Sequence, residues 1–235
     1  LFLTSGIIKL LYLLIKFRFK IVHNHWLIPF GPFSALFKSM FKYRLILTSH
    51  GGDILGFSKG IMGYLVQKFS EYAIKKADYY TVVSKEIKKV AEENFNIGFK
   101  DKLEVISMGI PYNNFHKVKP NFSKENFTAV FVGRLSEMKG TEYLIRAIGE
   151  LKNQRENIEC KIIGDGPERE YLKNLVKDLN IKNLVKFTGF IPHSQLIEEL
   201  DGTGVFVGPS ITTSAGHKEG FGLVFVEAMA AGIPV

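Results

Sequence analysis

Residues 127–140 read FTAVFVGRLSEMKG, and they join a predicted β-strand to a predicted α-helix. Phe127–Val132 is a short apolar run rich in β-branched and aromatic residues, which is typical of a buried strand. Gly133 and Gly140 bracket the turn that follows, and a helical pattern begins directly after it, over residues 141–153. A buried strand, a tight turn and a helix form the repeating unit of parallel α/β folds.

The same alternation extends in both directions from this segment. Before it, the sequence predicts strands at Lys20–Asn24, Arg44–Thr48, Tyr79–Val83 and Leu103–Ile106, and helices near residues 6–18, 32–42, 61–76 and 85–95. After it, the sequence predicts strands at Glu159–Ile163, Leu184–Thr188 and Gly204–Gly208, and helices over residues 168–180 and 193–200. We therefore predict an α/β protein of two Rossmann-like domains, each with a mainly parallel sheet flanked by helices.

The boundary between the two domains is predicted within residues 107–126, a segment that lacks periodicity and is rich in Pro and Asn. We place the domains at residues 1–117 and 127–235, with residues 118–126 as the linker. The chain begins without Met and ends where a further strand is expected to begin. We therefore expect an internal piece of a longer protein, in which both domains are incomplete.

The composition is that of a globular protein from a reducing compartment. With 235 residues, 46% of them hydrophobic, the chain can bury two cores. Cys160 is the single cysteine, which excludes an internal disulfide and favours a reducing compartment. The first fifteen residues are apolar, but Lys9 interrupts them and Lys16 follows. We interpret them as an amphipathic or core helix, because they fall short of a membrane span and no signal-peptide cleavage site follows.

The net charge of +8 is concentrated in the first half of the chain. Residues 1–120 carry 18 Lys and Arg against 8 Asp and Glu, whereas residues 121–235 carry 13 against 15. This asymmetry predicts an acidic partner for the first domain, such as a phosphorylated acceptor or an anionic membrane surface. Nucleic acid is disfavoured, because the basic residues are scattered through apolar helices without a recognition motif.

Two basic, apolar helices could attach the first domain to an anionic membrane. Basic residues border the first helix (Lys9, Lys16, Arg18 and Lys20) and surround the second (Lys38, Lys42 and Arg44). Each basic residue near an anionic surface contributes about 1 kcal/mol, so a few of them suffice for reversible attachment. The alternative is that these side chains are the solvated faces of core helices.

Two glutamates near the C-terminus lie on either side of a glycine-rich helix start. Glu219 precedes Gly220-Phe221-Gly222, and Glu227 lies within the apolar run from Leu223 to Ala231, which predicts a buried helix. The amides of Gly220 to Leu223 would face outward and favour an anion. The pattern predicts an anion site between two carboxylates that bind hydroxyl groups, as a phosphorylated sugar requires. Alternatively, Glu219 is only a dipole partner and Glu227 belongs to a solvated helix face.

Candidate ligand-binding residues follow the strands of the second domain, and ligands of open α/β sheets bind at the carboxyl ends of strands. Arg134 and Lys139 follow the strand quoted first, with Gly133 beside them. An Arg fork and a Lys point charge together suit a diphosphate. Phe190 and Ile191 follow a later strand, where the backbone could edge a nucleotide base.

Two further strand ends contain glycine. His50 follows the strand Arg44–Thr48 and precedes Gly51-Gly52-Asp53, so that the backbone and an imidazole can approach a ligand together. The segment Gly164-Asp165-Gly166-Pro167 follows another strand. We interpret it as a tight turn rather than a ligand contact.

A metal site and a covalent nucleophile are not expected. His23 and His25 would share one face of a strand and are candidate metal ligands, but no third ligand is evident. No Ser-His-Asp or Cys-His arrangement is indicated. The motifs Gly-x-x-x-x-Gly-Lys-[Ser/Thr] and Gly-x-Gly-x-x-Gly are absent from the sequence, which argues against P-loop and common dinucleotide sites.

Taken in order, these motifs resemble glycosyltransferase family 4, the retaining nucleotide-sugar transferases with the two-domain GT-B fold. The matching segments are His50-Gly51-Gly52-Asp53, Val83-Ser84, Ser107-Met108-Gly109-Ile110, Val132 to Gly140, Gly164 to Pro167, Phe187 to Phe190, and Glu219 to Glu227. Each motif is only modestly specific, but the ordered series across nearly the whole chain is a strong signal. Within the family, His23-Asn24-His25-Trp26 followed by Pro29-Phe30-Gly31 looks like transferases of bacterial surface polysaccharides or lipid-linked glycans.

The resemblance implies a donor site in the second domain. Arg134 and Lys139 would hold the donor diphosphate and stabilise the charge on the departing phosphate. Glu227 would bind the ribose hydroxyls, and Glu219 would bind hydroxyls of the transferred sugar. The amides of Gly220 to Leu223 would help to hold the sugar and the phosphate.

The resemblance also implies an acceptor side and a reaction course. His50 in the first domain would lie at the reaction centre, and Phe190 and Ile191 would frame the base, with the ligand between the carboxyl edges of both sheets. A hexose would pass from a UDP- or GDP-sugar to a glycan or lipid-linked acceptor by front-face attack. The departing phosphate would help to deprotonate the acceptor, without a metal, another cofactor or a protein nucleophile. Such an enzyme would be cytoplasmic, with attachment to the inner face of the membrane as an option.

The sequence departs from the family at both ends. The Gly-rich loop that borders the donor phosphate and the last strands and closing helix of the donor domain are missing, so we expect this fragment to be inactive even where its parent is an enzyme. Two alternatives stay open. One is a nucleotide-sugar-binding module without catalysis; the other is a GT-B phosphorylase, although no cofactor-anchoring lysine region is found.

Overall fold

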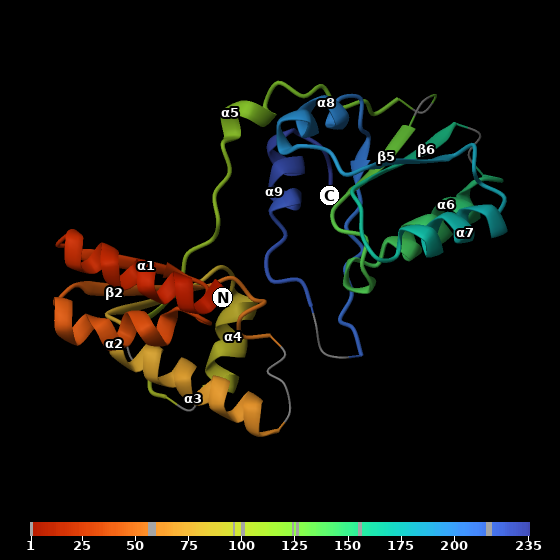
Figure 1. Cartoon of the computed structure of the whole chain (residues 1–235). Coiled ribbons are helices and arrows are strands. Elements are labelled where there is room, and N and C mark those ends of the chain that lie inside the picture. The colour runs from red at the N-terminus through yellow and green to blue at the C-terminus, as the bar shows by residue number, and fades with distance from the viewer. Residues whose placement is uncertain are drawn as a thin grey trace. The chain divides into compact units, whose positions relative to one another are not determined.

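The computed structural model divides into two compact units, Leu1–Met108 and Gly109–Val235 (Figure 1). The structure describes residues 2–55, 60–95, 97–99, 102–123, 125, 127–154, 157–214 and 218–235. Each unit contains a four-stranded sheet in which every pair of neighbouring strands is parallel. The predicted pair of parallel α/β domains is therefore confirmed.

Unit 1 alternates strands and helices in sequence order. Its strands are β1 (Ile21–His25), β2 (Arg44–Ser49), β3 (Tyr79–Val82) and β4 (Leu103–Val105), and its helices are α1 (Phe2–Lys16), α2 (Gly31–Phe41), α3 (Ile61–Lys76) and α4 (Lys85–Asn94). The strands lie in the order β1-β2-β3-β4, with Leu47 beside Tyr80 in the register. Leu45, Leu47 and Tyr80 are fully buried in the core.

An ion pair fixes the start of β2 and β3 in unit 1. Lys38 on α2 donates to Asp78 at 2.7 Å, and the Leu45 amide donates to the same Asp78 oxygen at 2.7 Å. The pair, together with the positive charge of Arg44, lowers the pKa of Asp78 against the opposing effect of burial. Lys38 therefore serves the fold of unit 1 rather than a free basic surface.

Unit 2 repeats the scheme with a strand order of β7-β6-β5-β8. Its strands are β5 (Phe127–Val132), β6 (Ile158–Ile163), β7 (Val185–Gly189) and β8 (Val205–Phe206), and its helices are α5 (Tyr112–Phe115), α6 (Thr141–Leu151), α7 (Arg169–Asp178), α8 (Leu196–Leu200) and α9 (Leu223–Ala230). Two short 3-10 helices, η2 (Glu137–Lys139) and η3 (His193–Gln195), precede α6 and α8.

The sheet of unit 2 has a hydrophobic core on each face. Alternating residues of β5 point to opposite faces, so that Phe131 packs in a cluster with residues of α6 and α7, whereas Val130 packs with α8 and α9. The second cluster also contains Phe115 and Val118. Both sides of the sheet are thus covered, as a parallel sheet requires.

The predicted strand Phe127–Val132 matches β5 at both ends, and the other predicted elements lie within a few residues of those observed. The predicted strand Gly204–Gly208 is limited to Val205–Phe206. The ring of Phe225 fills the place of a side chain at Gly208, because a Cβ there would lie 2.2 Å from that ring.

The division between the units lies earlier than the sequence indicated. Instead of a first domain over residues 1–117 and a linker over residues 118–126, unit 1 ends at Met108. Phe115 and Val118 are buried in the core of unit 2, so the segment that contains them belongs to that unit. Lys124 and Asn126 of the predicted linker lie outside the described residues.

No helix in the described part of the chain is both long enough and apolar enough to cross a membrane. The apolar N-terminal residues form α1, whose Leu14 is buried while Ile8 and Ile15 are 68% and 67% exposed. This helix is therefore amphipathic, as predicted.

Candidate functional site

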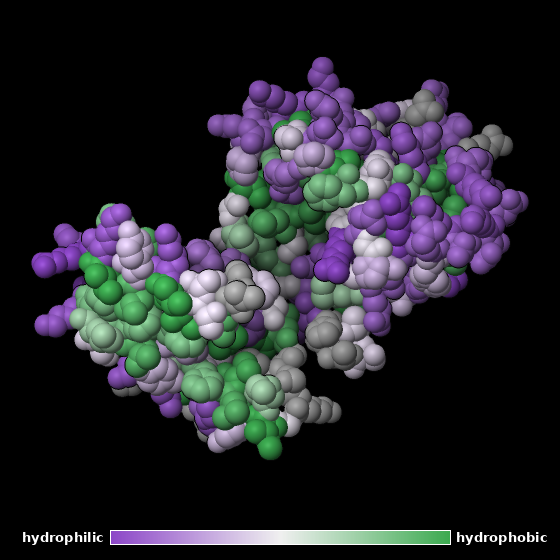
Figure 2. Space-filling model, viewed as in Figure 1, coloured by the Kyte–Doolittle hydropathy of each residue, from purple (hydrophilic) through white to green (hydrophobic). Residues whose placement is uncertain are grey.

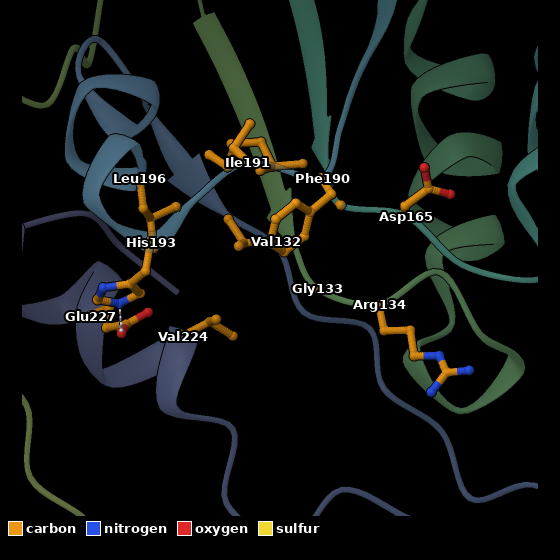
Figure 3. Close-up of a pocket in the computed structure, with 12 residues that line it drawn as sticks. Val132, Gly133, Arg134, Asp165, Phe190, Ile191, His193, Leu196, Val224 and Glu227 are labelled. Atoms are coloured by element: carbon orange, nitrogen blue, oxygen red, sulfur yellow. Dashed lines mark hydrogen bonds and ion pairs between the residues drawn. The ribbon is translucent and has the colours of Figure 1, made fainter.

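A cavity of about 510 Å³ opens at the carboxyl ends of β5, β6 and β7 in unit 2 (Figure 3). Its volume is in the range of ordinary small-molecule sites. The lining combines one cation, two carboxylates and an imidazole with apolar side chains. The lining residues are Val132, Gly133, Arg134, Ile163, Gly164, Asp165, Phe190, Ile191, His193, Leu196, Val224 and Glu227.

The turn that carries Arg134 is fixed by backbone hydrogen bonds to the neighbouring turn. The Gly133 amide donates to the Ile163 carbonyl at 3.0 Å, and the Leu135 amide donates to the Asp165 carbonyl at 2.9 Å. Leu135 is fully buried, whereas Arg134 is exposed and reaches the cavity. These two hydrogen bonds anchor the turn on both sides of Arg134.

Gly164 makes this contact between turns possible. It has a φ of 135°, and a Cβ at this position would lie 1.9 Å from the Gly133 carbonyl oxygen. The sequence predicts a tight turn rather than a ligand contact from Gly164 to Pro167. In the structure this turn supports the neighbouring turn through backbone hydrogen bonds. It holds the segment that presents Arg134, and Asp165 itself lines the cavity.

Lys139 and Glu219 form an ion pair. Their side chains are 18% and 25% exposed. Lys139 passes close to the Arg134 turn, since its Cε would lie 3.9 Å from a Cβ on Gly133. Among the described residues, these two lie outside the lining of the cavity. The structure thus brings together two of the predicted site residues, paired with each other.

The helix α9 begins at the predicted glycine-rich segment. Gly222 is its N-cap residue, with a φ of 68° and no side chain to cap the first turn. Leu223 is the first helical residue, and the Cγ of Glu219 would lie 3.6 Å from a Cβ on Gly222. Glu219 and the helix start are therefore adjacent, as predicted. Gly220 and Phe221, which precede the cap, are partly buried.

Glu227 is buried one turn inside α9, and its partner is a residue that the sequence analysis missed. The Nε2 atom of His193 lies 2.8 Å from Oε1 of Glu227. The side chain of Glu227 is 8% exposed, whereas that of His193 is 64% exposed. In Figure 3 the two side chains point toward each other, and Arg134 lies on the other side of the cavity.

A signal for His193 was present in the sequence. It follows the strand-end segment that contains Phe190 and Ile191, which was predicted to frame a base. The structure places all three residues in the lining of the cavity. Phe190 is 79% exposed and Ile191 packs against the core, so they offer an apolar surface beside the imidazole.

His50 lies in unit 1, in a loop that Asp53 organises. The buried carboxylate of Asp53 accepts hydrogen bonds from the amides of His50 and Gly51, both at 3.1 Å, and from the Leu27 amide at 2.7 Å. Nε2 of His50 lies 3.0 Å from Nδ1 of His25. Asp53 therefore joins the loop after β2 to the segment after β1.

Burial lowers the pKa of His50, and a positive charge on His25 lowers it further, while Asp53 acts in the opposite direction. Burial also lowers the pKa of His23, with His25 and His50 adding to the effect. The environment thus favours the neutral imidazole of His50, which can accept or donate a hydrogen bond.

The candidate metal ligands engage other partners in the structure. Nε2 of His23 lies 2.7 Å from Oγ1 of Thr48, and His25 contacts His50. Within the described ranges, no group of three or more His, Cys, Asp or Glu is arranged to hold a metal ion. The absence of a metal from the reaction remains a prediction.

Two Rossmann-like α/β units, each built on a parallel sheet, are the architecture of the GT-B fold class. The chain belongs to the family of glycosyl transferases group 1, whose model matches residues 113–235. The model for Glycosyltransferase Family 4 matches residues 1–113. The family and the fold class predicted from the sequence are confirmed.

Similar proteins include glycosyltransferases of polysaccharide biosynthesis. The chain is 32% identical to the uncharacterized glycosyltransferase MJ1178 of Methanocaldococcus jannaschii, over 92% of this chain and 54% of that protein. It is 32% identical to the putative colanic acid biosynthesis glycosyltransferase WcaL of Escherichia coli, over 58% of this chain and 34% of that protein.

A solved structure shows the same fold. HepE of Anabaena, in complex with UDP, superposes with a TM-score of 0.75 at 21% identity, over 97% of this chain and 62% of that chain. The match to MJ1178 covers most of this chain, and the chain spans about half the length of that relative.

Proposed function

We propose that the protein containing this chain is a retaining hexosyltransferase that uses a UDP- or GDP-sugar and acts in the synthesis of a surface polysaccharide. One observation carries the donor site: a single cavity is lined by Arg134, by the buried Glu227 with its partner His193, and by the apolar surface of Phe190 and Ile191. These are the groups that a diphosphate, a ribose and a base need, respectively. HepE, which has a similar fold, was solved in complex with UDP, and this supports the choice of ligand.

Each donor-site residue then has a defined task. Arg134 binds the diphosphate as a fork, and Lys139 adds a second positive charge. The Glu227 carboxylate accepts hydrogen bonds from ribose hydroxyls, and Glu219 accepts them from the transferred sugar. The amides from Gly220 to Leu223 at the start of α9 stabilise negative charge on the donor.

The reaction breaks the bond between the anomeric carbon and the diphosphate oxygen. The acceptor hydroxyl oxygen forms the new bond on the same face, and its proton passes to the departing phosphate. Arg134 and Lys139 stabilise the charge that develops on this phosphate, which is commonly the largest catalytic contribution in such sites. His50 lies on the acceptor side and orients the reacting hydroxyl through its neutral imidazole. In this scheme no metal is required.

The acceptor is a glycan or a lipid-linked glycan, and the protein acts in the cytoplasm at the inner face of the membrane. Unit 1 supports membrane attachment through α1, on which Ile8, Tyr12 and Ile15 form an exposed apolar face. Lys9 and Lys16 flank this face, with their ammonium groups 5.2 and 5.6 Å from the centre of the Tyr12 ring.

The test uses the full-length protein with a panel of UDP- and GDP-sugars. We expect one donor to bind and to be consumed in the presence of a chelator, with a product of unchanged anomeric configuration by NMR. Arg134→Ala should reduce kcat/KM by at least about 100-fold, since it removes charge stabilisation worth about 3 kcal/mol.

The test also separates the alternatives. Donor binding without turnover on any acceptor would indicate a binding module. Release of a sugar 1-phosphate that depends on inorganic phosphate would indicate a phosphorylase. Turnover that requires added magnesium or manganese would overturn the metal-independent scheme.

A further inference from the structure

An apolar groove of about 600 Å³ lies between α2 and α3 of unit 1. Among the described residues that line it, Lys68 is the charged one; the others are Ile28, Pro29, Pro32, Phe33, Leu36, Val66, Phe69 and Tyr72. Its volume is that of a small-molecule site. Such a lining offers few hydrogen bonds to a sugar and suits a hydrocarbon.

The groove begins beside the loop that carries His50. Ile28 and Pro29 follow Leu27 directly, and the Leu27 amide donates to Asp53 at 2.7 Å. The ring of Trp26 also covers this loop, since a Cβ on Gly52 would lie 3.4 Å from it. One wall of the groove is therefore joined by hydrogen bonds to the candidate reaction centre of unit 1.

The groove is part of a larger apolar surface. Figure 2 shows hydrophobic residues gathered on the face of unit 1 that α1, α2 and α3 form. Leu36 and Phe69 are 52% and 56% exposed at the groove, and Met40 and Met62 are 67% and 68% exposed on the same two helices outside its lining. Contiguous exposed apolar surface is a common feature of interaction sites.

The charge of unit 1 indicates which apolar ligand fits. Unit 1 carries 16 Lys and Arg against 8 Asp and Glu, whereas unit 2 carries 15 of each. Lys68 lies at the groove, 2.9 Å from Glu71, and its side chain is 49% exposed. An ammonium has three donors, so this group can still bind an anionic oxygen. The complementary ligand combines a hydrocarbon chain with a negatively charged head group.

We propose that the groove between α2 and α3 binds the hydrocarbon chain of a lipid-linked acceptor whose phosphate-bearing head extends toward the His50 loop. This inference rests on the proposed function and assigns its acceptor to the lipid class. A chain in the groove removes Leu36, Phe69 and Tyr72 from water. The bound hydrocarbon chain also positions the acceptor head, because the chain contacts the groove where the sugar does not.

The experiment measures binding of dodecyl phosphate, below its micellar concentration, to the full-length protein by calorimetry. Dodecyl phosphate should bind, and inorganic phosphate should not. Leu36→Glu and Phe69→Glu should weaken binding at least about tenfold, because a carboxylate is placed against the chain. The matched controls Met40→Glu and Met62→Glu, on the same helices outside the groove, should change it less than about twofold. Phe69→Leu should retain binding, and circular dichroism should confirm that each variant is folded.

Three results would overturn the inference. Equal losses in the groove and control variants would assign the effect to the whole surface. A dimer that Phe69→Glu dissociates and dodecyl phosphate leaves intact would make the groove an interface between copies. Transfer to a soluble glycan, with no binding of dodecyl phosphate, would exclude a lipid-linked acceptor and leave the proposed function in place. Failure of the proposed function is a separate outcome, seen as loss of nucleotide-sugar binding and transfer with every acceptor.

Discussion

Nε2 of His193 lies 2.8 Å from Oε1 of the buried Glu227, and this pair links η3 to α9 at one side of the donor cavity. A buried carboxylate needs a partner, and the imidazole supplies one while leaving the second oxygen for a ligand. Glu227→Ala should therefore weaken nucleotide binding by about 10- to 100-fold, which corresponds to roughly 1.5–3 kcal/mol for a charged hydrogen bond. His193→Ala should have a smaller effect in the same direction.

The measurement compares UDP or GDP with the corresponding 2′- and 3′-deoxy nucleotides by calorimetry. If Glu227 binds the ribose, both variants lose affinity for the ribonucleotide and change little for at least one deoxy analogue. His193→Gln keeps a donor near Glu227 and should restore part of the affinity. Parallel losses for ribonucleotides and both deoxy nucleotides would show that the pair only supports the fold.

Lys139 and Glu219 form an ion pair beside the donor cavity's Arg134 turn. The proposed donor uses both side chains, so it must replace this ion pair with contacts to the diphosphate and the sugar. Glu219→Gln removes the competing carboxylate, and we expect it to strengthen binding of the nucleoside diphosphate by about fivefold or less, since partly exposed ion pairs contribute up to about 1 kcal/mol. The same variant should lose preference for the nucleotide-sugar over the nucleoside diphosphate.

Lys139→Ala provides the matching control. It should weaken binding of the nucleoside diphosphate more than that of the monophosphate, because the lost charge lies near the Arg134 turn. A Glu219→Gln variant that loses affinity for the nucleoside diphosphate and the nucleotide-sugar in equal proportion would contradict a role in sugar binding.

The parts of the structure that the sequence predicted are those encoded by neighbouring residues. The run from Phe127 to Val132 has the apolar and β-branched composition of a buried strand, and the structure forms β5 over the same residues. The glycines of the next turn and the apolar run around Glu227 are local signals too, so the Arg134 turn and α9 were found. Hydrophobic periodicity and turn chemistry carry this information within a short window.

The parts that the sequence missed depend on contacts between distant residues. His193 and Glu227 are 34 positions apart, and no local pattern states that their side chains meet. The boundary was placed too late because Phe115 and Val118 lie in a segment rich in Pro and Asn, whereas their burial against unit 2 follows only from the tertiary packing. The groove between α2 and α3 was missed for the same reason.

Gly164 should be essential to the donor site through backbone contact alone. Gly164→Ala introduces a Cβ 1.9 Å from the Gly133 carbonyl oxygen, so the Arg134 turn must move. We expect a loss of stability above about 2 kcal/mol, because strain at positive φ adds to the clash. Nucleotide affinity should fall with it. Gly202→Ala is the control, since Gly202 also has a positive φ, 73°, but has nothing within 4 Å of a Cβ.

Two histidines of unit 1, His23 and His50, should make the stability of this unit depend on pH. The pKa of His50 and that of His23 are lowered in the folded protein, first by burial and then by the charge of neighbouring histidines. Near pH 6.5 and below, the unfolded chain therefore binds protons that the folded chain does not. Stability of unit 1 should be full above pH 6.5 and should fall as the pH drops through 6.5 toward the lowered pKa values.

Urea unfolding of the 235-residue chain, followed by Trp26 fluorescence, measures this effect, because Trp26 is the single tryptophan of these residues and lies in unit 1. The urea midpoint should be lower at pH 5.5 than at pH 7.5. His25→Gln removes the positive neighbour of both histidines and should reduce the difference. His116→Gln, in unit 2, should leave it unchanged, and an equal change in both variants would exclude the His25–His50 contact as the cause.

The last prediction concerns attachment of unit 1 to a membrane through α1. Ile8, Tyr12 and Ile15 are spaced along one exposed face of the helix, and Lys9 and Lys16 can extend past it toward anionic head groups. We expect the full-length protein to co-sediment with vesicles that contain anionic lipid. Binding should weaken as salt rises, because the Debye length falls to about 3 Å at 1 M.

Two double variants with the same charge change test the site of attachment. Lys9→Gln with Lys16→Gln should reduce vesicle binding by about 10- to 30-fold, since each basic residue near an anionic surface contributes about 1 kcal/mol. Lys85→Gln with Lys89→Gln alters exposed lysines on α4 and should have little effect. Ile15→Glu should weaken binding even at low salt, because it places a charge on the apolar face. Equal effects of the two lysine pairs would show that net charge alone attracts the protein, and equal binding to neutral vesicles would remove the electrostatic contribution.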